Sequence, residues 1–556
     1  MRPFTHPWGP PIEAELTHMA YLRVLTTVVI SGLIFIQSTI CGAEAANKTW
    51  PQAGGPSGQW IVKEGTAPVS WSVTQGRNVA WRTSLPEGGQ STVVVWNDRL
   101  FVTTNAPWPK DSEKKANGRD VVGYCLNALN GKILWSVKLP GIRDMKYAGI
   151  FSDSTSPSPL TDGKHIWFFN ASGYMGCWDF QGKAVWTRAW QPRQRHHSRQ
   201  FEPYLVGDTI LNVEVLDKVA ARNTAMHKDL PTGVEPRKLW TYLHGIDKHT
   251  GKIKWVAEAG TAIHNTPAVG ITAAGLPAVL HGRGGGHAPP EKPYGWSLTS
   301  LAPGEEGKTV WDVEIPGAGS HATSQWNADV ACWFHGADHF VVDAVKGVVL
   351  RQQNIEKEVT VTRFDVESQR YVTEPNQSVQ VGKKGERGTR ITNQANLLYG
   401  RHHYFLSWKG HLIGRVNTES GKVEYLQVPS LVDRRGAKEE RVWGKAPPND
   451  TRNSRGVNIG AVDKRSKGDG WGHVSAASPI VIGSRIYFPT MLGMVYVLDT
   501  RAEVWDGKAL LAINDMGPAT QTWSLASLSV AHGRIYHRTM KEVICIGQPF
   551  TKSGGR

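Results

Sequence analysis

Asp153 and Glu202 are two carboxylates in connecting segments whose residue type could support acid–base catalysis. A carboxylic acid and a carboxylate on either side of one glycosidic bond supply the acid and base of glycoside hydrolysis. The sequence does not set the distance between these two groups. A polysaccharide-processing enzyme is therefore one of three function classes to be weighed.

Further polar and aromatic side chains lie in similar segments, each between an outer strand and the next inner strand of a repeated unit. In a closed ring of such units these connections end at the mouth of a central channel, and convergent polar groups there are the default ligand site. The competing interpretation is that they are turn residues that satisfy backbone groups. The set comprises Asp153, Glu202, His264, Asn265, His321, Asn393, His473 and Trp523.

A glycine-rich loop, residues 282–287, is a second candidate for ligand binding. Its backbone N–H groups could form an anion-binding nest beside Arg283, although a flexible connector explains it equally well. It is not a dinucleotide-binding fingerprint, because Pro289 and Pro290 prevent the helix that must follow.

Signatures of several other chemistries are absent from the sequence. There is no GxSxG elbow, P-loop, kinase loop set, HExxH, CxxCH or CxxC motif, so we predict no metal site and assign no catalytic residue. Cys125, Cys177 and Cys545 fall at one repeated strand position, which favours small buried hydrophobes over bridges or ligands.

An internal repeat indicates the elements that would position these groups. Residues 245–255 read GIDKHTGKIKW, 125–135 read CLNALNGKILW and 415–425 read RVNTESGKVEY. The Asp or Asn closes a strand, the Gly supplies a positive φ at a hairpin, and the aromatic residue lies on the outer strand. A large aromatic there packs between neighbouring sheets. The predicted docking residues are Trp81, Trp135, Trp186, Trp255, Trp311 and Tyr425.

A second periodic signal is a polar residue that precedes each inner strand. The eight predicted strand starts are Thr92, Ser158, Glu202, Thr266, Ser324, Asn396, Ser478 and Ser527. The last unit ends near residue 547 without its Trp strand, while residues 78–81 form a Trp strand without a preceding hairpin. One missing and one spare strand predict a ring closed by the N-terminus. We therefore predict an all-β, eight-bladed propeller with four-stranded blades.

The repeat resembles the PQQ-like repeat family of eight-bladed β-propellers. The AxDxxTGxxxW motif of that family matches residues 245–255 and 125–135 closely, and the opening Trp50-Pro51-Gln52 is similar to the start of exported bacterial members. The resemblance covers roughly residues 50–550. It implies one of two roles, a quinoprotein dehydrogenase that binds pyrroloquinoline quinone (PQQ) and calcium over the channel, or a non-catalytic scaffold.

The sequence departs from the dehydrogenase branch in two ways. It lacks an adjacent Cys-Cys pair and a fused haem domain, and no local motif places Glu, Asn and Asp calcium ligands. We therefore expect an exported binding or scaffold protein. The alternative is a PQQ-dependent dehydrogenase that acts on alcohols or sugars.

The N-terminal 45 residues have the pattern of a targeting segment. Residues 24–36 form an apolar run that is too short for a relaxed membrane span, and Ala43-Glu44-Ala45 supplies a small-x-small cleavage pattern. Met19 is the expected true start, because residues 1–18 do not resemble a signal n-region. We predict a signal segment over 1–45, with an uncleaved anchor as the alternative, one propeller over 46–550 and a flexible tail over 551–556.

Charge favours an acidic partner. The chain of 556 residues carries a net charge of +15, and its 40% hydrophobic content excludes wholesale disorder. Insertions are expected at about 353–392 and 431–470. The insertion at 431–470 is basic, and so is the Arg/His stretch 193–199. Because these three segments all leave outer strands, we expect them on one face. The candidate partners are an anionic glycan, a lipid surface or an acidic protein, and nucleic acid is not expected.

Overall fold

The structure is a computed structural model. It describes residues 48–88, 91–107, 120–142, 155, 157–190, 202–215, 241–261, 266–283, 294–315, 322–381, 391–454, 456–459, 471 and 477–550. Apart from Lys48, these residues belong to one compact unit, Thr49–Arg556. The predicted targeting segment and C-terminal tail lie outside the described residues. No helix in the described ranges is long and apolar enough to span a membrane.

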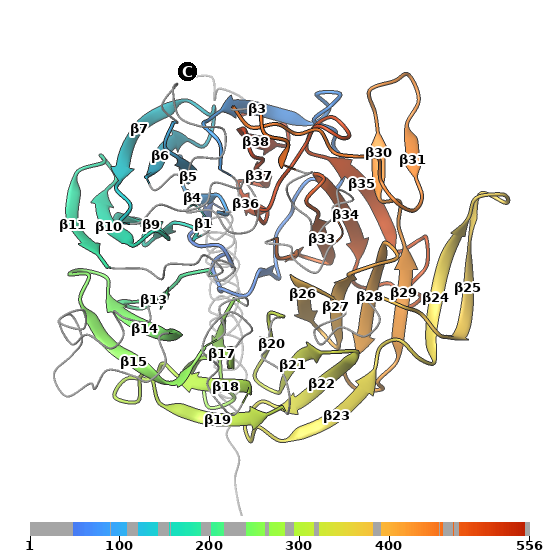
Figure 1. Ribbon diagram of the computed structural model, residues 1–556, viewed down its shortest axis with the longest axis horizontal. Helices are drawn as coiled ribbons and strands as arrows, with labels where there is room; N and C mark the ends of the chain where they lie inside the picture. The colour runs from blue at the N-terminus through green and yellow to red at the C-terminus, as the bar shows by residue number, and fades with distance from the viewer. Residues whose placement is uncertain are drawn as a thin grey trace, which may run out of the picture. The chain divides into compact units, whose positions relative to one another are not determined.

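The described chain forms successive sheets of mainly antiparallel strands, each of which runs from an inner to an outer strand (Figure 1). The first sheet contains β1 (Thr49–Trp50), β4 (Val94–Trp96), β5 (Arg99–Asn105), β6 (Val121–Asn127) and β7 (Ile133–Leu139). The second contains β8 (Leu160–Thr161), β9 (His165–Asn170), β10 (Tyr174–Asp179) and β11 (Ala184–Ala189). The third contains β12 (Tyr204–Val206), β13 (Thr209–Val215), β14 (Thr241–Asp247) and β15 (Ile253–Gly260). The fourth contains β16 (Ala268–Ile271), β17 (Pro277–Arg283), β18 (Gly295–Ser300) and β19 (Thr309–Glu314).

The later sheets follow the same order around the ring. The fifth contains β20 (Gln325–Trp326), β21 (Val330–His335), β22 (Asp338–Asp343) and β23 (Val349–Asn354). The sixth contains β24 (Val359–Asp365), β25 (Arg370–Gln377), β26 (Ile391–Tyr399), β27 (His402–Ser407), β28 (Leu412–Asn417) and β29 (Val423–Gln427). The seventh contains β2 (Ile61–Val62), β32 (Ile480–Ile482), β33 (Arg485–Pro489), β34 (Met494–Asp499) and β35 (Leu510–Asp515). The eighth contains β3 (Val79–Ser84), β36 (Ser529–Ala531), β37 (Arg534–Arg538) and β38 (Glu542–Ile546).

The fold is an all-β propeller, and its repeating unit is a four-stranded sheet, as the sequence predicts. An N-terminal strand completes the eighth sheet, because β3 pairs antiparallel with β38 and Trp81 lies opposite Cys545. A second N-terminal strand also joins a sheet that is distant in sequence, since β2 pairs in parallel with β32, whereas β1 pairs with β4 of the first sheet. The first and last parts of the chain are thus held together by backbone pairing.

Most hairpin glycines pack on the aromatic residue of the preceding sheet. A Cβ built on Gly131 would lie 2.6 Å from the Trp81 ring, and one on Gly251 would lie 2.6 Å from Trp186, so a larger residue would clash. Gly131 also has a φ of 74°. The indole Nε1 of Trp81 donates to the Ala128 carbonyl of the next turn at 3.1 Å. Trp135, Trp186 and Trp311 make equivalent bonds to the turn carbonyls of Phe180, Lys248 and Ala344.

Tyr425 departs from the predicted docking role. The strand β24 pairs in parallel with β29 and covers Tyr425, whose hydroxyl donates to the Ile355 carbonyl at 2.6 Å. Tyr371 on β25 instead lies against Gly507, the hairpin glycine of the seventh sheet. In the sixth sheet, the β24–β25 hairpin forms the outer edge. Tyr371 on that hairpin therefore takes the docking position that the sequence predicts for Tyr425.

The two long insertions differ from each other. The described part of 353–392 contains the β24–β25 hairpin, which extends the sixth sheet at its outer edge and projects from the ring (Figure 1). The described part of 431–470 contains a separate two-stranded sheet, β30 (Leu431–Asp433) and β31 (Glu440–Val442). The strand β24 covers residues 359–364, whose alternation of apolar and polar side chains is typical of a strand.

The repeated cysteines lie where the sequence places them. Cys125 is paired across the sheet with Trp135, Cys177 with Trp186, and Cys545 with Trp81. All three thiols are free and buried. Burial raises the pKa of the Cys125 and Cys177 thiols to about 12, so these groups stay protonated and behave as small apolar side chains.

Candidate functional site

The polar residues at the strand starts connect neighbouring sheets. The Thr92 amide donates to Ser158 Oγ at 2.7 Å, and the Ser158 amide donates to Glu202 Oε2 at 3.0 Å. In each case the backbone of one sheet donates to the side chain of the next. The same arrangement joins Ser478 to Ser527 at 2.8 Å and Thr266 to Thr323 at 3.3 Å. We refer to these four contacts as the inter-sheet bonds.

Glu202 is one of these acceptors. Part of the residue reaches the surface, but its carboxyl group is enclosed by protein. This desolvation raises the pKa of Glu202 to about 8, and the hydrogen bonds from Ser158 oppose the rise. Glu202 is therefore mostly protonated at neutral pH and fills the position that a serine or threonine fills elsewhere in the ring.

Glu202→Gln tests this assignment, because the amide keeps an oxygen acceptor for the Ser158 N–H. Between the ordinary carboxyl pKa and about 8, the folded wild type holds a proton on Glu202 that the unfolded chain has lost, so the contribution of this group to stability falls as pH rises through this range. The buried histidines, whose pKa values are lowered, act alike on both proteins, so the difference between the two profiles isolates Glu202. We expect the wild type to lose on the order of 1–3 kcal/mol of stability relative to the variant between pH 5 and 8. Urea unfolding at several pH values measures both, and parallel profiles would contradict the prediction.

The other described members of the predicted channel mouth are also occupied by local structure. Trp523 is 1% exposed, and its carbonyl accepts the Met540 amide. Arg283, at the end of β17, is 7% exposed and is paired with Asp312 through Nη1 at 2.6 Å. The remaining predicted members fall outside the described side chains, and these are Asp153, His264, Asn265, His321, Asn393 and His473.

The donors that are described do not fit the calcium and PQQ that the repeat implies. Ca²⁺ prefers six to eight oxygen ligands, chiefly ionised carboxylates and carbonyls. Glu202 is mostly neutral and accepts the Ser158 amide, and within the described ranges the one group of three or more His, Cys, Asp or Glu suited to a metal contains no carboxylate. We therefore derive no step through either group.

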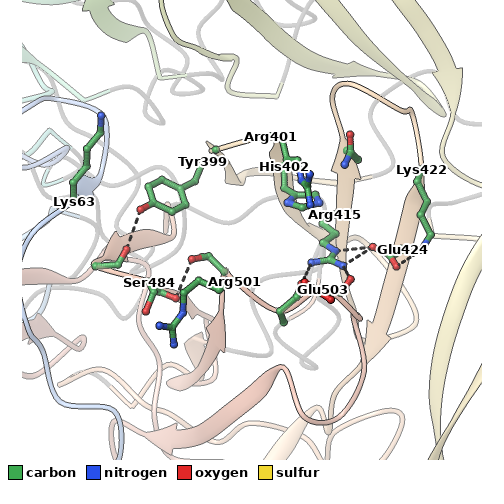
Figure 2. A pocket seen from close by; sticks show the side chains of 15 residues that line it. Lys63, Tyr399, Arg401, His402, Arg415, Lys422, Glu424, Ser484, Arg501 and Glu503 are labelled. Atoms are coloured by element: carbon green, nitrogen blue, oxygen red, sulfur yellow. Dashed lines mark hydrogen bonds and ion pairs between the residues drawn. The ribbon is translucent and has the colours of Figure 1, made fainter.

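A pocket of about 700 Å³ lies between the sixth and seventh sheets (Figure 2). Its walls are the β26–β27 turn, parts of β28 and β29, the β32–β33 turn and the segment after β34, with Lys63 from the N-terminal segment. Five of its lining residues are Lys or Arg and two are Glu. Sequence reasoning missed this pocket, since its cations come from turns that are far apart in the sequence.

Arg415 forms the floor of this pocket and is fully engaged. It is 1% exposed, its Nε donates to Glu424 Oε2 at 2.7 Å, and its Nη atoms donate to the Ala502 and Glu503 carbonyls at 2.6 and 2.7 Å. Burial would raise the pKa of Glu424, but hydrogen bonds from Lys422 and Arg415 outweigh it and lower that pKa. Glu424 therefore neutralises its cations inside the pocket wall.

The rim of the pocket is cationic. Lys63, Arg401 and Arg501 are exposed. Arg501 is paired with Asp499 at 2.9 Å, whereas in the described part of the chain neither Lys63 nor Arg401 has a carboxylate partner. Burial and then the charges of Arg415 and Arg401 lower the pKa of His402 to about 4, so this imidazole is neutral at neutral pH. The positive potential of the rim suits an anionic group.

The basic insertion is less available for an acidic ligand than its composition predicts. The four described arginines of 431–470 each contact a carboxylate, and only Asp515 lies outside the insertion: Arg434 with Asp515 and Glu439, Arg435 with Asp433, Arg441 with Glu439, and Arg452 with Asp450. The stretch 193–199 lies outside the described residues.

Comparisons with known proteins give structural neighbours without a sequence match. No family model and no curated protein matches this sequence. Similar solved structures include BamB from Moraxella catarrhalis, at 10% identity and a TM-score of 0.43, covering 83% of this chain and 98% of that one. A quinohemoprotein alcohol dehydrogenase from Comamonas testosteroni has 12% identity and a TM-score of 0.48, covering 93% and 84%. A europium-containing methanol dehydrogenase has 10% identity and a TM-score of 0.47, covering 90% of each chain. These values assign no activity to this chain.

Proposed function

We propose that this chain is an exported, non-catalytic propeller of eight blades that binds an acidic ligand at the pocket between its sixth and seventh sheets. The eight described sheets of four or more strands support the blade count. The apolar run and cleavage pattern of the N-terminal segment support export. The observation that carries the binding role is the cationic rim around the pocket, where the exposed Lys63 and Arg401 lie near Arg501, which is itself paired with Asp499.

The pocket is suited to binding rather than to catalysis. Its buried arginine is satisfied by Glu424 and by two backbone carbonyls, which fixes the wall, and its one described imidazole, His402, is neutral and flanked by arginines. A ligand carboxylate, sulfate or phosphate would replace the water around the rim cations, and its affinity would fall with rising salt.

Replacing the three rim cations tests the proposal. We expect Lys63→Ser/Arg401→Ser/Arg501→Ser to weaken the binding of heparin, anionic lipid vesicles or polyglutamate at low salt by roughly tenfold or more, since each exposed charge contributes up to about 1 kcal/mol. Binding is measured by isothermal titration or co-sedimentation with each probe. The probe that binds identifies the ligand class.

A matched control carries the same loss of charge elsewhere. Lys132, Lys183 and Lys252 are exposed lysines at the hairpins of the first three sheets, and replacing all three with Ser should leave the affinity within about twofold of wild type. If both triple variants bind the probes with equally reduced affinity, the loss is explained by net charge alone, which would contradict a site at the pocket.

Reconstitution distinguishes the binding protein from a dehydrogenase. The full chain is incubated with PQQ and calcium and then assayed with alcohols and sugars by dye reduction. We expect no stoichiometric quinone spectrum and no turnover. A bound quinone with turnover would overturn the non-catalytic assignment.

A further inference from the structure

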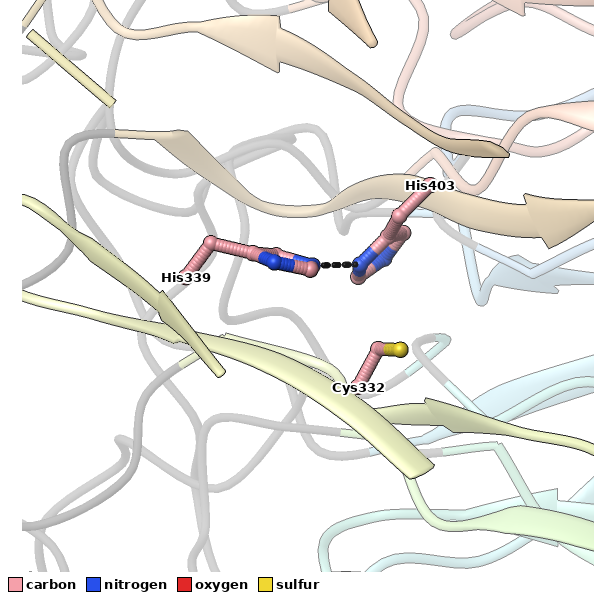
Figure 3. A group of neighbouring side chains, drawn as sticks. All are labelled: Cys332, His339 and His403. Carbon is pink, nitrogen blue, oxygen red and sulfur yellow. Dashed lines mark hydrogen bonds between the residues drawn. The ribbon is translucent and has the colours of Figure 1, made fainter. Parts of the chain in front are cut away.

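Three potential metal ligands from different strands meet between the fifth and sixth sheets (Figure 3). Cys332 lies on β21, His339 on β22 and His403 on β27, and each is fully buried. One ligand atom from each residue lies within 4.8 Å of the other two. Figure 3 shows the Cys332 side chain on one side of the imidazole pair, near His403. A thiol and two imidazoles are the donors that copper and zinc prefer in proteins.

Hydrogen bonding orients both imidazoles for coordination. Asn396 Oδ1 lies 3.0 Å from His403 Nε2 and therefore accepts its proton, which leaves a lone pair on His403 Nδ1. His339 Nε2 lies 2.9 Å from that Nδ1 and donates to it. An outer amide that fixes the tautomer of a ligating histidine is a common support of metal sites. The lone pair of His403 Nδ1 is thus directed at His339, and it becomes available to a metal once the Nε2 proton of His339 has moved.

Apolar surroundings keep the cluster uncharged without a metal. The Phe334 ring lies 4.8 Å from the His339 ring and 4.7 Å from the His403 ring, between centroids. Burial, and then the charge of Arg351, lowers the pKa of His339 to about 3, and burial lowers that of His403 well below its usual value. Both rings are therefore neutral, so neither has to be converted from an imidazolium before it can bind a metal.

We propose that Cys332 Sγ, His339 Nε2 and His403 Nδ1 bind one Cu(I) ion. On binding, the thiol proton leaves to solvent, and the Nε2 proton of His339 moves to its Nδ1. That Nδ1 has no partner among the described residues and can take the proton. No electron is transferred. Two nitrogens bound at about 2.0 Å in a trigonal site lie roughly 3.5 Å apart, so the imidazoles need to separate by well under 1 Å. They must also turn toward the sulfur, which lies within 4.8 Å of both.

Charge balance favours Cu(I) over a divalent ion. One thiolate and two neutral imidazoles give an uncharged complex with a monovalent cation, whereas Zn²⁺ would leave a net positive charge in a fully buried site. The nearby Arg351, whose charge already acts on His339, adds to the cost of that positive charge. A three-coordinate site that includes a soft sulfur ligand also suits Cu(I).

Competition with a chelator and X-ray absorption test the site. The full chain is given Cu(I) anaerobically, both when folded and during refolding so that burial does not block entry, and is then titrated with bicinchoninate. We expect one tightly bound equivalent and an absorption spectrum with one sulfur and two nitrogen scatterers. Cys332→Ser and His339→Gln should each lower the affinity by at least about 100-fold.

Cys177→Ser is the control variant, and the X-ray absorption spectrum of the wild type is the second measurement. Cys177→Ser removes another buried strand cysteine, one whose cross-strand partner is Trp186, and should bind copper as the wild type does. If the site variants fail to fold, the wild-type absorption spectrum decides. No retained copper, a spectrum without sulfur, or unchanged binding in Cys332→Ser would each overturn the proposal.

Discussion

A chain that starts at Pro86 is expected to lose the cooperative unfolding transition that a chain starting at Ala46 shows. The deletion removes β1, β2 and β3, and so removes strands from the first, seventh and eighth sheets. It exposes the edge of β38 and takes Trp81 away from the Ala128 turn. The free energy of unfolding of a domain is only about 5–15 kcal/mol, and the lost pairing and burial exceed it. Calorimetry and near-ultraviolet circular dichroism measure the result.

The control for this deletion is a change on the same strand that leaves the pairing intact. Arg82→Ser removes an exposed ion pair with Glu542 at 2.7 Å and should cost less than about 1 kcal/mol. If the shortened chain melts with the midpoint and enthalpy of the longer one, β3 does not close the ring.

Asp515→Ala is expected to be the most destabilising single substitution among the charged residues discussed. Asp515 is 1% exposed and accepts the Arg434 Nη1–H at 2.9 Å and the Thr74 amide and hydroxyl at 2.8 and 2.7 Å. It thus joins the insertion, the seventh sheet and the N-terminal segment at one carboxylate. Removing one partner of a buried ion pair costs about 3–5 kcal/mol, because the other charge stays buried. Urea unfolding of the two proteins measures this difference.

Asp433→Ala is the matched comparison within the same insertion. Its partner, Arg435, is 45% exposed, so solvent screens that pair and we expect a cost below about 1 kcal/mol. Arg434→Ala should resemble Asp515→Ala, since it leaves the same carboxylate buried without its cation. Equal, small effects for Asp515 and Asp433 would show that the buried pair does not hold the insertion in place.

The repeat made much of the fold predictable because local chemistry and packing agree in it. At Asn127 the side chain closes the turn, at Gly131 a positive φ is needed, and at Trp135 a large apolar area faces the neighbouring sheet. The spare strand around Trp81 then required a partner, which is β38. The exception is Tyr425, whose motif is intact but whose outer face is covered by β24, a strand outside the repeat.

The candidate sites were less predictable, because they depend on side chains brought together by the ring and not by the chain. Lys63 and Arg401 are 338 positions apart, and neither belongs to a motif. His339 and His403 lie on different sheets, so no spacing rule could pair them with Cys332. Glu202 was singled out correctly as a strand start, but its environment assigns it to the inter-sheet bonds.

The inter-sheet bonds all run in one direction, from the amide of a sheet to a side chain of the sheet that follows it in the chain. While the chain emerges from its N-terminus, each of these amides lacks its side-chain acceptor until the following sheet is present. Ser529 of the last sheet also donates to the Val93 carbonyl of the first, so the segment made earliest receives a partner made almost last. A chain that lacks the last sheet therefore leaves the first sheet without this partner, and the ring is complete only when the final strands are present.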